Sequence, residues 1–279
     1  MTKSALLIIM LVISACSSTP DPRPYALTQS EQLMQQGISA YQQDNYPQAS
    51  KSFNAAITLY QSIDDQHGVL LAQINLIKSN LAISQFALTE QIFSTLNTNT
   101  ATPALRAQII ALRAHSLFLQ QNYPAALHTF APLLKQLSDR HAPVNNAQIK
   151  LLLMQTKYAL FARTPDAPIW FQRLSTVMTD NTQVSSAQLA LFNRLAAHNA
   201  LHAGRHTQAL TLMQTSLTSY KAIVNRRATA ACLQELAKIH IAMHNIVAAQ
   251  QALGRALLIR QWLQDSYKTQ QISQQLAAL

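Results

Sequence analysis

The sequence predicts an all-α fold built from repeated helical hairpins. A pattern of alternating bulky and small residues recurs six times, and within each copy these residues follow helical spacing. The steps between the small residues are 40, 37, 41, 42 and 40 residues. The chain has only 4 glycines in 279 residues, and its apolar residues do not alternate as in strands. The small residues of the six copies are Ala49, Thr89, Ala126, Ala167, Ala209 and Ala249.

The first copy, residues 37–56, shows how each hairpin is built. Gly37 lies on the first helix, where a missing side chain lets the second helix approach closely. Pro47 stands at the start of the second helix, the one helical position that tolerates a missing N–H. Ala49 and Phe53 then share one face of that helix. We expect the aromatic ring to fill the gap between the two backbones.

These aromatic and small positions resemble those of the tetratricopeptide repeat family. The match is best where the turns read DNYP at 44–47 and QNYP at 121–124. Covering roughly residues 28–258, it implies a right-handed α-solenoid of about six hairpins. The period near 40 exceeds the family's usual 34, so the second helices or the links should be longer. We expect a repeat domain over 28–265, starting at the capping-box pattern Thr28-x-x-Glu31, and a capping helix over 266–279.

The N-terminus predicts export and lipidation. Lys3 precedes an apolar run over 5–13, too short to span a bilayer but typical of a signal peptide. Residues 13–16, ISAC, resemble the bacterial lipoprotein box. This implies a signal peptide over 1–15, acylation of Cys16 and a lipidated tether over 16–27. Because serine follows the cysteine, the resemblance implies an outer-membrane anchor facing the periplasm. The alternative is a plain signal peptide with an incidental cysteine.

The charge pattern favours a protein partner over nucleic acid. The chain has 21 Lys and Arg against 11 Asp and Glu, a formal net charge of +10, yet only 11% of its residues are charged. It is basic through a shortage of acids and lacks the dense basic stripe that nucleic-acid binding favours. We therefore expect no nucleic acid. The expected partner is an extended or helical protein segment with acidic and apolar side chains.

In the resembled family, the inner faces of the first helices line a groove that receives such segments. Mapped onto this chain, that face is apolar with scattered positive groups, and Glu31 is its only acid. The predicted partner-binding residues are Tyr41, Lys78, His115, Phe118, Arg194, His198, His202 and Lys238. Some of the apolar residues on this face are equally compatible with a core position. The cations are the stronger candidates, because charges are rarely buried without partners.

No motif indicates catalysis. No glycine-rich loop would hold a phosphate, and no serine or cysteine nucleophile has a recognisable setting. The adjacent acids Asp64 and Asp65 fall between repeats and suit a helix cap. We therefore predict a non-enzymatic scaffold or adaptor without a cofactor, of the kind that serves pilus, wall-enzyme or outer-membrane assembly.

A periplasmic metal-binding protein is the alternative function. His198 and His202 are four residues apart, and His240 and His244 repeat that spacing one copy later. Two histidines so spaced share a helix face and can bind one metal ion. The other expectation for these histidines is a polar role at groove and turn positions. Cys232, the cysteine left after lipidation, is expected to be a buried thiol, with a disulfide to another chain as the alternative.

Overall fold

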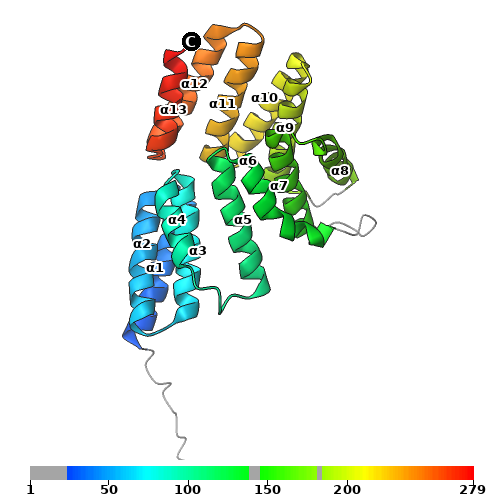
Figure 1. Ribbon diagram of the computed structural model, residues 1–279. Helices are drawn as coiled ribbons and strands as arrows, with labels where there is room; N and C mark the ends of the chain where they lie inside the picture. The colour runs from blue at the N-terminus through cyan, green and yellow to red at the C-terminus, as the bar shows by residue number, and fades with distance from the viewer. Residues whose placement is uncertain (1–23, 138–144, 181–183) are drawn as a thin grey trace, which may run out of the picture.

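The computed structural model describes residues 24–137, 145–180 and 184–279, and every regular element of these residues is helical. Six consecutive helical hairpins and one final helix form a tetratricopeptide-like α-solenoid (Figure 1), as predicted. The first helices are α1 (Tyr25–Gln42), α3 (Gln66–Ala82), α5 (Pro103–Leu119), α7 (Asn146–Ala162), α9 (Ser186–His202) and α11 (Arg226–Ala242). The second helices are α2 (Tyr46–Ser62), α4 (Phe86–Thr95), α6 (Tyr123–Phe130), α8 (Ala167–Asp180), α10 (His206–Ala222) and α12 (Ile246–Trp262). A 3-10 helix, η1 (Ala131–Leu137), continues α6, and α13 (Ser266–Ala277) is the capping helix.

The 40-residue period comes from two 17-residue helices and two three-residue turns, as from α10 to the start of α12. The extra length therefore lies in both helices of a hairpin. The middle residue of such a turn has a positive φ, for example Asp44, Val224 and Gly204. The last residue often caps the next helix: the Asp65 carboxylate accepts a hydrogen bond of 2.8 Å from the Gly68 N–H, as expected of this acid pair.

The first helix begins at Tyr25, so the predicted start at Thr28 is wrong. Pro24, with φ −52°, already has the backbone angle that a helix start needs, and Thr28 donates its hydroxyl to the Pro24 carbonyl at 3.4 Å. The signal peptide, Cys16 and the tether before residue 24 lie outside the described residues. In the described ranges, no helix combines the length and the apolar character needed to cross a membrane.

The repeated small residues form the contact line of each hairpin. All six are buried, from Ala49 at 0% exposed to Ala167 at 5%. In the first hairpin, a Cβ added at Gly37 would stand 2.5 Å from the Phe53 ring, which confirms that the glycine admits the aromatic side chain. Cys232 is fully buried, as predicted, with its Sγ 3.4 Å from the Ser216 hydroxyl.

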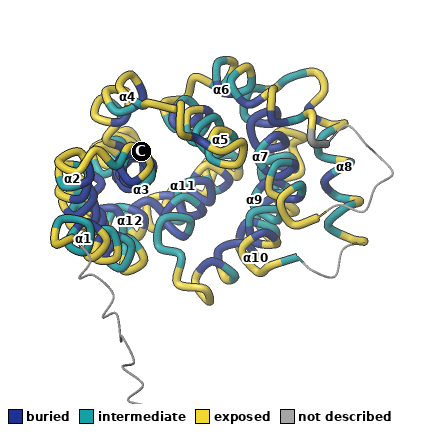
Figure 2. Tube along the Cα trace, turned by 90° about the horizontal axis from the view of Figure 1, so that it is seen from below, coloured by how far each residue is buried: buried dark blue, intermediate teal, exposed yellow. Residues whose placement is uncertain are grey.

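The two ends of the solenoid meet (Figures 1 and 2). Arg226 donates a hydrogen bond of 2.7 Å to the Asp44 carboxylate, and Arg227 donates one of 3.1 Å to the Tyr41 hydroxyl. An apolar cluster joins the same ends; it consists of Tyr46, Ala82, Ile83 and Leu263. We call these the closure contacts. Because of them, the concave side is bounded by both ends of the repeat array.

Candidate functional site

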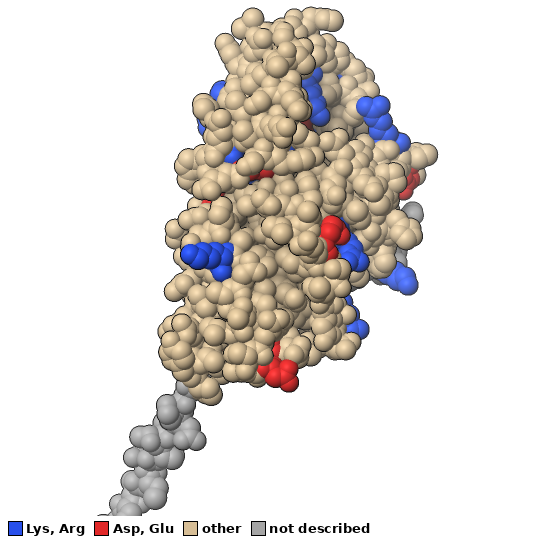
Figure 3. All heavy atoms as spheres, turned by 60° about the vertical axis from the view of Figure 1, so that its left-hand side comes forward, with Lys and Arg blue, Asp and Glu red and all other residues tan. Residues whose placement is uncertain are grey.

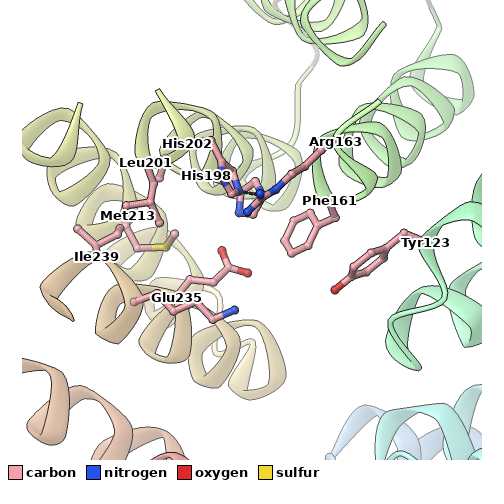
Figure 4. A pocket seen from close by; sticks show the side chains of 11 residues that line it. Tyr123, Phe161, Arg163, His198, Leu201, His202, Met213, Glu235 and Ile239 are labelled. Carbon is pink, nitrogen blue, oxygen red and sulfur yellow. Dashed lines mark hydrogen bonds between the residues drawn. The ribbon is translucent and has the colours of Figure 1, made fainter. Parts of the chain in front are cut away.

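Two neighbouring cavities, of about 360 and 180 Å³, lie on the concave side of the solenoid. They share four lining residues and together are called the channel. Figure 4 shows the larger cavity, with aromatic side chains on one side and the Glu235 carboxylate facing them from α11. The shared residues are Tyr123, Phe161, Glu235 and Lys238.

A buried ion pair crosses the channel floor between α9 and α11. The Arg194 guanidinium donates to the Glu235 carboxylate at 2.5 Å, and both side chains are at most 16% exposed. Burial raises the pKa of Glu235, but the charge and hydrogen bond of Arg194 outweigh it, so the net pKa is lowered. The second carboxylate oxygen of Glu235 is buried without a protein partner. The pair therefore holds two repeats together while leaving one acceptor unsatisfied.

Aromatic rings form the wall opposite this ion pair. Phe118 lies 5.1 Å from Phe161 and 5.3 Å from Tyr123, measured between ring centroids. The Lys157 ammonium lies 4.1 Å from the centroid of the Phe118 ring. Burial and the nearby Arg194 charge lower the pKa of Lys157 to about 7. This lysine is therefore held largely by a ring face rather than by a carboxylate.

The histidine pair lies at the edge of the channel. His198 stacks on Phe161 with centroids 4.0 Å apart, and its Nε2 lies 3.0 Å from the Nε2 of His202. Burial lowers the pKa of His198 to about 4, although Glu235 opposes this, and burial also lowers the pKa of His202. Both rings are thus neutral at neutral pH, and one donates its N–H to the other.

Only two of the four histidines that were considered as metal ligands lie next to each other. His198 and His202 meet, whereas His244 occupies a turn with φ 58° and His240 has a buried Nδ1 without a partner. No cluster of three or more His, Cys, Asp or Glu side chains suited to a metal ion occurs within the described ranges.

Five of the eight predicted groove residues line the channel, namely Phe118, Arg194, His198, His202 and Lys238. The other three do not. Tyr41 joins the closure contacts, Lys78 donates to Asn75 at 3.1 Å, and His115 stacks on Phe118. Burial, with the charges of Lys157 and Arg227, lowers the pKa of His115 well below its usual value.

One expectation about charge in the groove is wrong. Glu31 was expected to be the only acid of the inner face, whereas Glu235 lines both cavities. Arg194, predicted as a partner-binding residue, lines the smaller cavity and also pairs with Glu235. Helical spacing predicts which face a residue occupies but does not say which side chains pair across two repeats.

Several lining residues were missed because they lie outside the first-helix faces that the prediction considered. Tyr123 begins α6, Arg163 is a left-handed C-cap with φ 54°, and Lys268 belongs to the capping helix. Each enters the channel because the solenoid curves back until α13 and the ends of the middle hairpins border the same space. No local sequence signal marks these positions.

Comparisons with known proteins identify the fold only. Neither a family model nor a curated protein matches this chain. A solved structure of a Rap protein complexed with competence and sporulation factor is similar, with TM-score 0.56 and 13% identity over 87% of this chain and 71% of that one. The apo form of RapI matches with TM-score 0.51 and 13% identity, over 82% of this chain and 65% of that one. The structural match therefore covers about two thirds of the length of each of these two proteins.

Proposed function

We propose that this protein is a non-enzymatic scaffold or adaptor that binds a segment of a protein partner in the channel. The observation that carries the proposal is the channel itself, where apolar rings face cations on the concave side of a solenoid. Such a surface suits a segment with apolar anchors and acidic side chains. The similar Rap protein was crystallised in complex with competence and sporulation factor, which supports the proposal that a fold of this kind binds a partner.

We further propose that the protein is anchored by lipid at Cys16 in the outer membrane of a bacterial envelope and faces the periplasm. The support is the ISAC sequence at 13–16 and the serine that follows it. Several acyl chains would make the anchor effectively permanent, since each buried CH₂ contributes about 0.8 kcal/mol.

Partner binding is tested by crosslinking in intact envelopes followed by purification of the protein. The bait is the wild type and Lys238→Glu, which reverses an exposed charge in the channel. Arg194 is left unchanged, because its reversal would place two carboxylates together in the core. Lys51→Glu, on the exposed side of α2, is the matched control.

We expect one envelope protein to be captured by the wild type and by Lys51→Glu and lost with Lys238→Glu, while helical circular dichroism stays the same. Equal capture by all three would show that the channel is not the binding surface. The anchor is tested separately by palmitate labelling and membrane fractionation. Cys16→Ser should lose the label and leave the outer-membrane fraction; unchanged fractionation would contradict the lipid anchor.

A further inference from the structure

Cationic side chains outnumber carboxylates in the lining of the smaller cavity. Among the residues that line it, Arg194, Lys238, Arg260 and Lys268 are cations and Glu235 is the single carboxylate. Glu235 is already engaged by Arg194, and Arg260 pairs with Asp265 at 3.2 Å. The two lysines are therefore left to face the cavity as surplus charge.

The surplus cations have few acceptors. Within the described part of the chain, neither Lys238 nor Lys268 has a carboxylate within ion-pair distance, and Lys268 donates only to the Gln271 side-chain oxygen at 2.9 Å. The Nε of Arg260, a residue that is 7% exposed, is buried without an acceptor. We call Lys238, Arg260 and Lys268 the cation subsite.

These groups already repel one another. Burial lowers the pKa of Lys268, and the charges of Arg260 and Lys238 lower it further, while Asp265 opposes them. Burial also lowers the pKa of Arg260, with contributions from the charge of Arg194. Like charges gathered in a partly desolvated site destabilise the fold unless an anion is bound between them. The outer face drawn in Figure 3, by contrast, shows only scattered charged side chains.

The opposite wall of the same cavity is aromatic. Phe118, Tyr123 and Phe161 line it and contact one another through their rings. We call these three residues the aromatic subsite. Burial raises the pKa of the Tyr123 hydroxyl, so that group stays protonated and able to donate. A ligand in this cavity therefore meets positive charge on one side and ring surface on the other.

We propose that the channel recognises a short extended peptide segment that places a carboxylate in the cation subsite and an adjacent aromatic or apolar side chain in the aromatic subsite. This rests on the proposed function, because it specifies the ligand of the same channel. An extended segment fits better than a helix, whose diameter with side chains is about 10–12 Å. Both subsites border the smaller cavity, of about 180 Å³, and the adjoining cavity of about 360 Å³ shares Tyr123, Phe161 and Lys238 with it, so an extended segment can run from one cavity into the other.

The test uses isothermal titration calorimetry on the full chain in detergent. The probe is a blocked tripeptide of glutamate, phenylalanine and glutamate. Its controls replace both glutamates with glutamine, or the phenylalanine with alanine. We expect each control peptide to bind at least about tenfold more weakly, which corresponds to about 1.4 kcal/mol. Affinity for the acidic probe should also fall as sodium chloride is raised, because salt screens the charges.

The double variant Lys238→Gln with Lys268→Gln should lose at least about tenfold in affinity for the acidic probe. The matched control, Lys51→Gln with Lys221→Gln, neutralises two exposed lysines on α2 and α10 and should bind as the wild type does. Should the channel variant fold poorly, the glutamine peptide and the salt dependence still test the proposal on the wild type.

Three results would overturn the proposal: equal affinity for the glutamate and glutamine peptides, the same loss in both double variants, or no binding of the acidic probe. Inorganic phosphate is titrated as a separate ligand. Phosphate that binds as tightly as the peptide would show a free-anion site and would equally refute peptide recognition. The crosslinking experiment tests the scaffold function, and calorimetry tests peptide recognition. Either experiment can succeed while the other fails, so the failure of one proposal is distinguishable from the failure of the other.

Discussion

Replacing Lys157 with methionine should stabilise the fold at neutral pH and remove a pH dependence of stability. The lysine is 9% exposed, and its ammonium faces the Phe118 ring. Burial and Arg194 lower its pKa from 10.5 to about 7, although Glu235 opposes this. Methionine retains a long unbranched chain that can pack on the ring without a buried charge.

The magnitude follows from proton linkage. Between pH 7 and 10.5 the unfolded chain binds the Lys157 proton more tightly than the folded chain, so the free energy of unfolding rises with pH across this window. Below pH 7 Lys157 is charged in both states, so the unfavourable contribution of its buried ammonium to folding is fully present. With these two pKa values, raising the pH from about 7 to about 9 should increase stability by roughly 2 kcal/mol.

Urea unfolding, followed by circular dichroism at both pH values, measures this difference. The wild type should gain roughly 2 kcal/mol more than Lys157→Met on going to the higher pH. At pH 7 the variant should be the more stable by about 1–4 kcal/mol. Lys150→Met, at an exposed position of the same helix, is the control and should follow the wild type. If Lys157→Met followed the wild type at both pH values, or were less stable at pH 7, the reasoning would be refuted.

Three further substitutions test the fold. Gly37→Ala should lower the free energy of unfolding in urea by about 1–2 kcal/mol, because its Cβ would overlap a phenylalanine ring. Gly254→Ala, whose Cβ would have nothing within 4 Å, is the control and should be neutral or stabilising. Equal effects of the two substitutions would contradict the close approach of the helices. Val224→Asn should stabilise by about 1 kcal/mol, because a β-branched residue there has φ 53°; a loss of stability would show that the valine packs usefully. Arg226→Glu should increase the radius of gyration in small-angle scattering, and adding Asp44→Lys should reverse this; no expansion would mean that the ion pair does not hold the ends together.

The hairpins were predictable because their signals are local. A small residue every 40 or so positions, a proline at the second helix start and an asparagine cap each act within a few residues, and they recur. Asn45 and Asn122 cap α2 and α6 as the DNYP and QNYP turns suggest. The shorter α4 and the 3-10 continuation of α6 were not predicted, because the repeat pattern gives spacing but not the length of each helix.

The closure contacts and the ion pair inside the channel were not predictable by the same means. Asp44 and Arg226 are 182 residues apart, and their pairing depends on how far the whole array curves. That curvature accumulates from small rotations between hairpins, which no single repeat encodes. Glu235 could have been suspected as an acid on an otherwise apolar and basic helix. Its pairing with Arg194 still required the placement of α9 beside α11.

The use of the few acids explains why the channel is basic. In three ion pairs of the described residues, Asp44, Glu235 and Asp265 each pair with an arginine, and every pair includes a residue of α11 or α12. Asp44 and Glu235 link different hairpins, whereas Asp265 pairs with Arg260 at the turn between α12 and α13. Each of these carboxylates therefore has an arginine as its ion-pair partner and leaves Lys238 and Lys268 without one. With only 11 acids against 21 Lys and Arg, this pairing leaves positive charge in the smaller cavity, between the middle hairpins and the C-terminal helices. A ligand with carboxylates would restore that balance, which ties the stability of the C-terminal hairpins to occupancy of the channel.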